Sequence, residues 1–240
     1  MGEFLSSFAS FFFPVRCPCC GKVSSVYEPC KECADALDLV RIKGTSCFRC
    51  GEPIIECHCR GFNPLYAGIV APFKRNGVAK DAIYALKFKS RFYPAEYFGC
   101  EMAAEFKRRC PDVKVDIVCV VPMTRKERAD KPCDQVAELA RYVVKSFDAS
   151  YEPKLIKKVR ETKRQRDLEL KERAANIKDA FRVDKRLNGE TVLLLDDIKT
   201  SGYTLNECAK QLRLQGAKEV WCLTSLVTPF SSCKDDKIDV

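Results

Sequence analysis

The cysteines of this chain crowd near its amino terminus, and this crowding constrains the fold more than any other feature of the sequence. Nine of the 16 cysteines lie between Cys17 and Cys59, and the other seven are spread over the rest of the 240 residues. Disulfide-rich domains are usually exported, but the opening MGEFLSSFASFFFP has Glu3 as its only charge and no small-residue cleavage site follows it. We therefore expect a metal-binding cluster in a reducing compartment.

Closely spaced thiols make up this cluster. Two residues between thiolates let a tight turn direct both sulfurs at one tetrahedral ion about 2.3 Å away, and Gly21 and Gly51 supply a permissive backbone after two of the turns. Sequential pairing predicts two structural zinc sites, formed by Cys17, Cys20, Cys30 and Cys33 and by Cys47, Cys50, Cys57 and Cys59. Cross-braced pairing, a single zinc, an iron–sulfur cluster and participation of Cys19 or His58 are the open alternatives.

From residue 65 onward, buried-strand patterns alternate with amphipathic helices. Strands are predicted over 65–73, 116–121, 191–195 and 219–227, and helices over 78–88, 96–109, 134–146 and 203–215. This alternation is typical of βαβ units around a parallel sheet. We expect an α/β fold with two parts: a cysteine-rich, zinc-binding module over 1–60, similar to a double zinc ribbon, and a parallel-sheet domain over 61–240.

The end of the predicted strand 191–195 carries the strongest functional pattern. Asp196 and Asp197 follow it directly, and Thr200-Ser201-Gly202-Tyr203-Thr204 then leads into a helix. Helix N-termini favour phosphate, whereas two carboxylates repel phosphate and suit the hydroxyls of a diol. Together they predict a ribose 5-phosphate site, the alternative being that both parts are ordinary strand and helix caps. The chain has neither a Walker loop nor a GxGxxG motif, which argues against nucleotide hydrolysis and dinucleotide binding.

This segment resembles the signature of type I phosphoribosyltransferases, which bind phosphoribosyl pyrophosphate (PRPP). The whole chain resembles the ComF family, in which a cysteine-rich module is fused to a phosphoribosyltransferase-like domain. The motifs that carry the resemblance are FFFPVRCPCCG, CFRCGEP, YALKFKSR, CVVPM, VRETKRQRDLELKERAANIKDAF and LLLDDIKTSGYTLNECAKQLRLQGA. The resemblance implies a type I phosphoribosyltransferase fold, structural zinc, and Mg²⁺ bound together with PRPP.

The resemblance also implies roles for individual residues. The turn 122–125 would be the pyrophosphate loop, and 160–178 a lid over PRPP, although a solvated basic helix is the alternative for the latter. The implied PRPP-binding residues are Lys87, Met123, Thr124, Arg125, Asp196, Asp197, Lys199, Thr200, Ser201, Gly202, Tyr203 and Thr204; those implied in catalysis are Asp196, Asp197, Arg125 and Arg164. After the loop the chain reads Lys131-Pro132-Cys133-Asp134-Gln135 where the family has Arg-Gly-Phe-Asn-Gln, so only Gln135 is retained.

Two functions agree with these patterns. The first is phosphoribosyl transfer with release of pyrophosphate, in the context of natural competence and DNA uptake. The second is an accessory protein of the transformation machinery that binds PRPP and single-stranded DNA without turnover, which the net charge of +9 would also suit. We expect a cytoplasmic protein, since no apolar run approaches the ~20 residues of a membrane span. The aromatic run in residues 4–13 either packs on the body or contacts the inner face of the cytoplasmic membrane.

Overall fold

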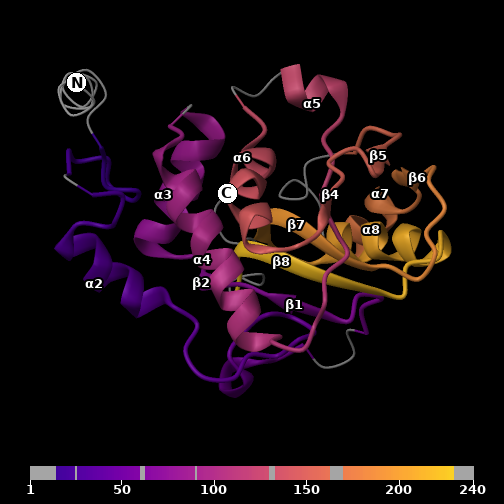
Figure 1. Ribbon diagram of the computed structural model, residues 1–240, viewed down its shortest axis with the longest axis horizontal. Helices are drawn as coiled ribbons and strands as arrows, with labels where there is room; N and C mark the ends of the chain where they lie inside the picture. Colours follow the sequence, from indigo (N-terminus) through magenta and orange to yellow (C-terminus); the bar gives the residue numbers. More distant parts are fainter. Residues whose placement is uncertain are drawn as a thin grey trace.

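A parallel sheet forms the centre of the computed structural model, which describes residues 15–24, 26–59, 63–89, 91–129, 133–162 and 170–229 (Figure 1). Its strands are β1 (Gly68–Val70), β2 (Phe73–Lys74), β3 (Ile117–Val120), β4 (Ser150–Tyr151), β7 (Thr191–Lys199) and β8 (Glu219–Val227). Their order is β1-β8-β7-β3-β4, with β2 also on β8, and every pairing is parallel. The predicted parallel-sheet α/β class is confirmed.

Helices cover both faces of this sheet, as a parallel sheet requires. On one face lie α3 (Gly77–Phe88), α4 (Tyr93–Arg109) and α6 (Gln135–Val143). On the other, toward the right of Figure 1, lie α7 (Leu170–Ile177), α8 (Tyr203–Leu214) and the antiparallel pair β5 (Ile156–Lys158) and β6 (Phe181–Val183). Strand β7 divides its side chains between the two faces: Leu193 and Leu195 join the first core, and Val192 and Leu194 the second.

The cysteine-rich segment packs against the first of these two layers. Its main helix, α2 (Lys31–Val40), lies beside α3, and Cys17, Cys33 and Leu37 are buried in the same apolar core as α3 and α4. A short 3-10 helix, η1 (Ile54–Glu56), precedes its last cysteines. The segment and the sheet domain therefore share one core.

The observed elements differ from the predicted ones mainly at their ends. Strand β7 continues through the two acids to Lys199, and 65–73 forms two short strands, β1 and β2, rather than one. The predicted helix 134–146 ends at Val143, where the 3-10 helix η2 (Val144–Ser146) follows. The aromatic run before Val15 lies outside the described residues, and no described helix is long and apolar enough to cross a membrane.

Candidate functional site

The predicted phosphate turn and the predicted pyrophosphate loop follow two neighbouring strands. Strands β3 and β7 pair in register from Ile117–Val192 to Val120–Leu195. The chain leaves β3 toward β4 at one side and leaves β7 toward β8 at the other. Ligands of open α/β sheets bind at the carboxyl ends of strands where the connections diverge in this way. The segments 121–124 and 200–204 both begin at this point.

The two acids at the end of β7 have different surroundings. Asp197 is 5% exposed, and its Oδ2 accepts hydrogen bonds from Lys87 Nζ and from Gln135 Nε2, each at 3.0 Å. Its Oδ1 accepts from the backbone N–H of Ile198 at 2.8 Å. Asp196 is half-buried, and its Oδ1 accepts from the backbone N–H of Asp197 at 2.9 Å. Asp197 thus joins β7 to α3 and α6, while Asp196 has no basic partner among the described residues.

These surroundings move the two carboxyl pKa values in opposite directions. Burial acts to raise the pKa of Asp197, but the charge and hydrogen bond of Lys87 and the Gln135 amide outweigh it, so the pKa is lowered. Burial and the charge of Asp197 raise the pKa of Asp196 well above its usual value. The Asp197 carboxylate in turn raises the pKa of Lys87. The site therefore favours an ionised Asp197 paired with Lys87. Binding of a cation nearby would favour ionisation of Asp196 as well.

The turn between β7 and α8 contains a glycine in a left-handed conformation. Gly202 precedes the helix with φ +83°, in the left-handed region that favours glycine. Gly202 is the N-cap of α8, and because it has no side chain it cannot cap the helix with a side-chain hydrogen bond. The first turn of α8 also contains no acidic residue. Lys199 ends β7, is 4% exposed, and makes no ion pair with any described residue. The turn therefore joins a lysine at the end of β7 to a helix that begins at a glycine, next to the acid pair.

The loop after β3 is held by a reciprocal capping box. The backbone N–H of Thr124 donates to Glu127 Oε2 at 2.8 Å, and the N–H of Glu127 donates to Thr124 Oγ1 at 3.1 Å. Lys158 of β5, almost fully buried, donates to Glu127 Oε1 at 2.6 Å. These bonds fix the start of the short helix α5 (Arg125–Ala129). The side chain of Arg125 and the whole of Arg164 lie outside what is described.

The structure gathers the eight predicted cysteine ligands into two groups of four. Cys17, Cys20, Cys30 and Cys33 form one group and Cys47, Cys50, Cys57 and Cys59 the other, with the sulfurs of each group within 4.8 Å of one another. A tetrahedral zinc with bonds of about 2.3 Å requires sulfurs about 3.8 Å apart. The separations for Cys20–Cys30, Cys47–Cys59, Cys50–Cys57 and Cys57–Cys59 are 3.9, 3.7, 3.5 and 3.3 Å. Both groups therefore fit a zinc ion.

Backbone hydrogen bonds favour the thiolate form of one cysteine of the first group, Cys17. Burial acts to raise the pKa of Cys17, but backbone N–H groups, among them that of Cys30 at 3.3 Å, lower it to about 6. Cys19 is not part of this group of four, and burial raises its pKa to about 12. His58 is exposed, with Nδ1 2.7 Å from the carbonyl oxygen of Glu56. The sequential grouping thus agrees with the structure better than a grouping that includes Cys19 or His58.

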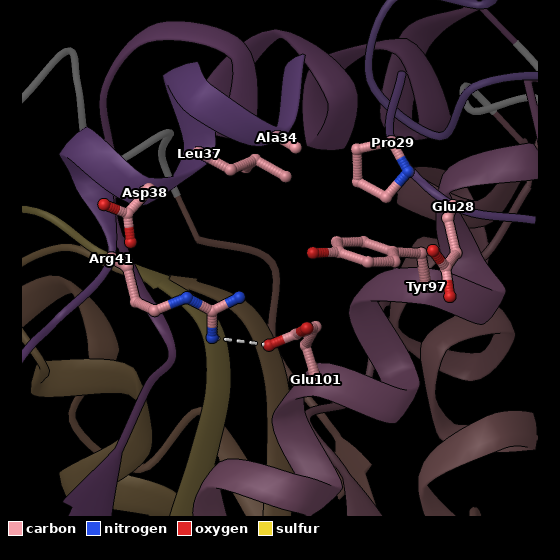
Figure 2. Close-up of a pocket in the computed structure, with 8 residues that line it drawn as sticks. All are labelled: Glu28, Pro29, Ala34, Leu37, Asp38, Arg41, Tyr97 and Glu101. Atoms are coloured by element: carbon pink, nitrogen blue, oxygen red, sulfur yellow. Dashed lines mark hydrogen bonds and ion pairs between the residues drawn. The ribbon is translucent and has the colours of Figure 1, made fainter. Parts of the chain in front are cut away.

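A separate pocket of about 350 Å³ lies between α2 and α4, where the cysteine-rich segment meets the body (Figure 2). Arg41 crosses it to Glu101, with an Nη1–Oε2 distance of 2.7 Å, and stacks over Phe73 at 4.7 Å. The phenol of Tyr97 points into the same space, and Asp38 lies at its edge. With acids and a paired guanidinium in its wall, the pocket has no single charge that would select a ligand, and we assign it to packing.

Sequence comparisons identify relatives of this chain, although no family model matches it. The chain is 26% identical over 204 residues to the DNA utilization protein YhgH of Escherichia coli K12, an alignment that covers 81% of this chain and 88% of the relative. It is 28% identical over 144 residues to competence protein F of Haemophilus influenzae, covering 58% and 63%. The chain is a homologue of these two proteins, whose names agree with the predicted resemblance to the ComF family. The resemblance predicted from the motifs is thereby confirmed.

Solved structures with some likeness include a hypoxanthine-guanine phosphoribosyltransferase from Bacillus anthracis. It is 18% identical, with a TM-score of 0.36, and the match covers 62% of this chain and 75% of that one. An allosteric regulatory enzyme of purine biosynthesis is 20% identical with a TM-score of 0.34, and the match covers 54% of this chain and only a quarter, 25%, of that one. Likeness at this level carries no argument about the function of the site.

Sequence reasoning missed the residues that support the site rather than those that form it. The sequence marks Gln135 only as a position retained from the family motif, yet its side chain contacts Asp197. For Glu127 the sequence does carry a signal, because the Thr-x-x-Glu spacing from Thr124 to Glu127 is typical of a capping box. No sequence signal indicates that Lys158 reaches Glu127, because the two lie 31 positions apart.

Proposed function

We propose that the chain binds PRPP at the carboxyl ends of β3 and β7, as the phosphoribosyltransferase-like domain of a protein that acts in DNA uptake or utilisation. The observation that carries the proposal is the coincidence, at one point of the sheet, of an acid pair, a glycine-initiated helix and the loop after the neighbouring strand. The names of the relatives, DNA utilization protein and competence protein F, support the biological context.

Each part of PRPP has a chemically matched counterpart in this proposal. The turn 200–204 and the start of α8 would hold the 5-phosphate through N–H groups and hydroxyls. Asp196 would accept hydrogen bonds from the ribose hydroxyls. The loop 122–125, which includes Arg125, would hold the pyrophosphate.

Transfer would proceed by electrostatic stabilisation. The bond from the anomeric carbon to the pyrophosphate oxygen breaks as an acceptor nucleophile bonds to that carbon, and the electron pair leaves with pyrophosphate. Arg125, with Arg164 from the lid, would stabilise the charge that develops on the leaving group. Mg²⁺ would arrive with PRPP, held mostly by its oxygens and water, and supplies positive charge there. Of the two acids, Asp196 is the better candidate to bind this Mg²⁺ ion. Asp197 is already paired with Lys87, whereas Asp196 forms no ion pair with any described residue.

We further propose that the two cysteine groups each bind a structural zinc ion and that residues 1–60 form a zinc-binding module, whose described part packs on the core of the sheet domain. The short distances between the sulfurs within each cysteine group support zinc binding. The zinc ions would stabilise this cysteine-rich segment, which is too short to form a sufficient hydrophobic core of its own. In phosphoribosyltransferase-like proteins a module at this position would contribute to the acceptor side of the site.

Binding and turnover of PRPP test the proposal in two steps. Calorimetry with PRPP and Mg²⁺ should give saturable binding to the wild type, and Asp196→Asn should weaken it strongly. Asp38→Asn, which changes an exposed acid of the α2 pocket, is the matched control and should bind as the wild type does. Pyrophosphate release in the presence of candidate acceptors then reports turnover. Absence of PRPP binding in the zinc-loaded, folded wild type would refute the proposal.

A second candidate is an accessory role in which PRPP is bound but not consumed and single-stranded DNA is the main partner. The net charge of +9 and the relatives' names favour it. Binding of a single-stranded oligonucleotide that falls steeply with salt, persists in Asp196→Asn, and occurs without pyrophosphate release would favour this role over the enzyme.

A further inference from the structure

The amide of Gln135 has one half satisfied and one half without a partner. Its side chain is 3% exposed, and Nε2 donates to Asp197 Oδ2 at 3.0 Å. Its Oε1 is buried and accepts no hydrogen bond from any described residue. Buried acceptors without a donor are rare and costly, and they are found where a ligand or water completes the site.

The orientation of this amide is fixed by its neighbour. Asp197 is ionised, because Lys87 lowers its pKa, and an ionised carboxylate can only accept. The amide nitrogen must therefore face Asp197, and the oxygen must face away from it. The reverse orientation would place two acceptors against each other, so the partnerless oxygen is a consequence of the ion pair.

The position of Gln135 is also fixed by its helix. Asp134 caps α6 by accepting from the N–H of Ala137 at 3.2 Å, and the thiol of Cys133 donates to the Leu86 carbonyl of α3 at 3.3 Å. Gln135 is the first residue of α6, so its backbone is held between these two contacts. The side chain cannot turn its oxygen to solvent without breaking the contact with Asp197.

The chemistry of an occupant follows from the orphan oxygen. An acceptor requires a donor, which excludes the oxygens of phosphate and pyrophosphate and leaves hydroxyl or N–H groups. Asp197 already accepts three hydrogen bonds, so on this side of β7 the open acceptor is Gln135. We propose that Gln135 Oε1 accepts a hydrogen bond from one ring hydroxyl of the ribose 5-phosphate moiety. This inference rests on the proposed PRPP site and adds a sugar-recognising residue to it.

A thermodynamic cycle separates this role from a merely structural one. The variant is Gln135→Met, which keeps the size of the side chain but removes both polar atoms. The probes are ribose 5-phosphate, 2-deoxyribose 5-phosphate and 3-deoxyribose 5-phosphate, measured in competition with PRPP. We expect the variant to bind ribose 5-phosphate up to about tenfold more weakly. For one of the deoxy sugars, the variant and the wild type should bind equally well, because the hydroxyl that Gln135 contacts is already missing.

Equal weakening for all three probes would overturn the proposal, because Gln135 would then act only through Asp197. No weakening for any probe would overturn it as well, leaving water as the partner of the oxygen. If Gln135→Met does not fold, Gln135→Asn can replace it. Its side chain keeps the amide but is one methylene shorter, and its affinities for the three sugars are compared with those of the wild type in the same way. Failure of the wild type to bind any of the three sugars or PRPP would instead refute the proposed function.

Discussion

Replacing Asp197 by asparagine, with Asp196→Asn as the matched control, separates the two neighbouring acids by their effect on stability. Asp197 is buried and accepts from Lys87, Gln135 and a backbone N–H, so its charge stabilises the fold. The raised pKa of Asp196 means that its ionisation at pH 7 opposes folding. We expect Asp197→Asn to destabilise the protein, and Asp196→Asn to leave its stability unchanged or raise it.

The size of the first effect follows from the contacts. Breaking a buried ion pair by removing one partner costs about 3–5 kcal/mol, and the Lys87 and Asp197 side chains are 24% and 7% exposed. Asparagine keeps the shape and one acceptor, so we expect a loss of about 2–4 kcal/mol in the free energy of unfolding. For a chain of this size, that corresponds to a fall in Tm of roughly 5–15 °C.

The assay is thermal and urea unfolding of zinc-loaded protein at pH 7, followed by circular dichroism. Both variants should lose PRPP affinity, since both acids lie at the proposed site. Only the effect on the free energy of unfolding should therefore distinguish the two variants. The reasoning is wrong if Asp197→Asn is as stable as the wild type, or if Asp196→Asn is the more destabilised of the two.

Three further perturbations have defined outcomes. Lys87→Met should unfold more easily at pH 7, and its stability should fall less between pH 5 and 3. In the wild type this ion pair contributes fully above the unfolded aspartate pKa of about 3.9 and is lost as the pH falls through the lower folded pKa; equal pH profiles would contradict this. Cys50→Ser should bind one zinc fewer by elemental analysis, whereas Cys100→Ser, on the exposed side of α4, should keep the wild-type content. Gly202→Ala and Gly189→Ala both place alanine at positive φ and should each cost about 1 kcal/mol, but only the first should weaken ribose 5-phosphate binding.

The parallel sheet and the cysteine groups were predictable because their signals are local. Buried strands in a parallel sheet form short apolar runs, and the strand 219–227 was predicted with its observed bounds. The paired cysteines restrict the metal geometry by their spacing alone, and the structure brings together the same two groups of four that sequential pairing predicts.

The end of β7 was less predictable, because its length depends on neighbours. Strand β7 continues past Leu195 since β8 pairs with it as far as Lys199, a long-range pairing that no local pattern reports. The different roles of the two acids were equally hidden. They depend on Lys87 and Gln135, which lie 110 and 62 positions away from Asp197 in the chain.

Hydrogen–deuterium exchange with and without PRPP and Mg²⁺ tests the central claim most directly, because it locates binding as well as detecting it. We expect slower exchange in the peptides that span 196–206 and 121–127, which follow β7 and β3, and unchanged exchange over 31–40 in α2. Protection confined to the cysteine-rich segment, or no protection at saturating PRPP, would contradict the account.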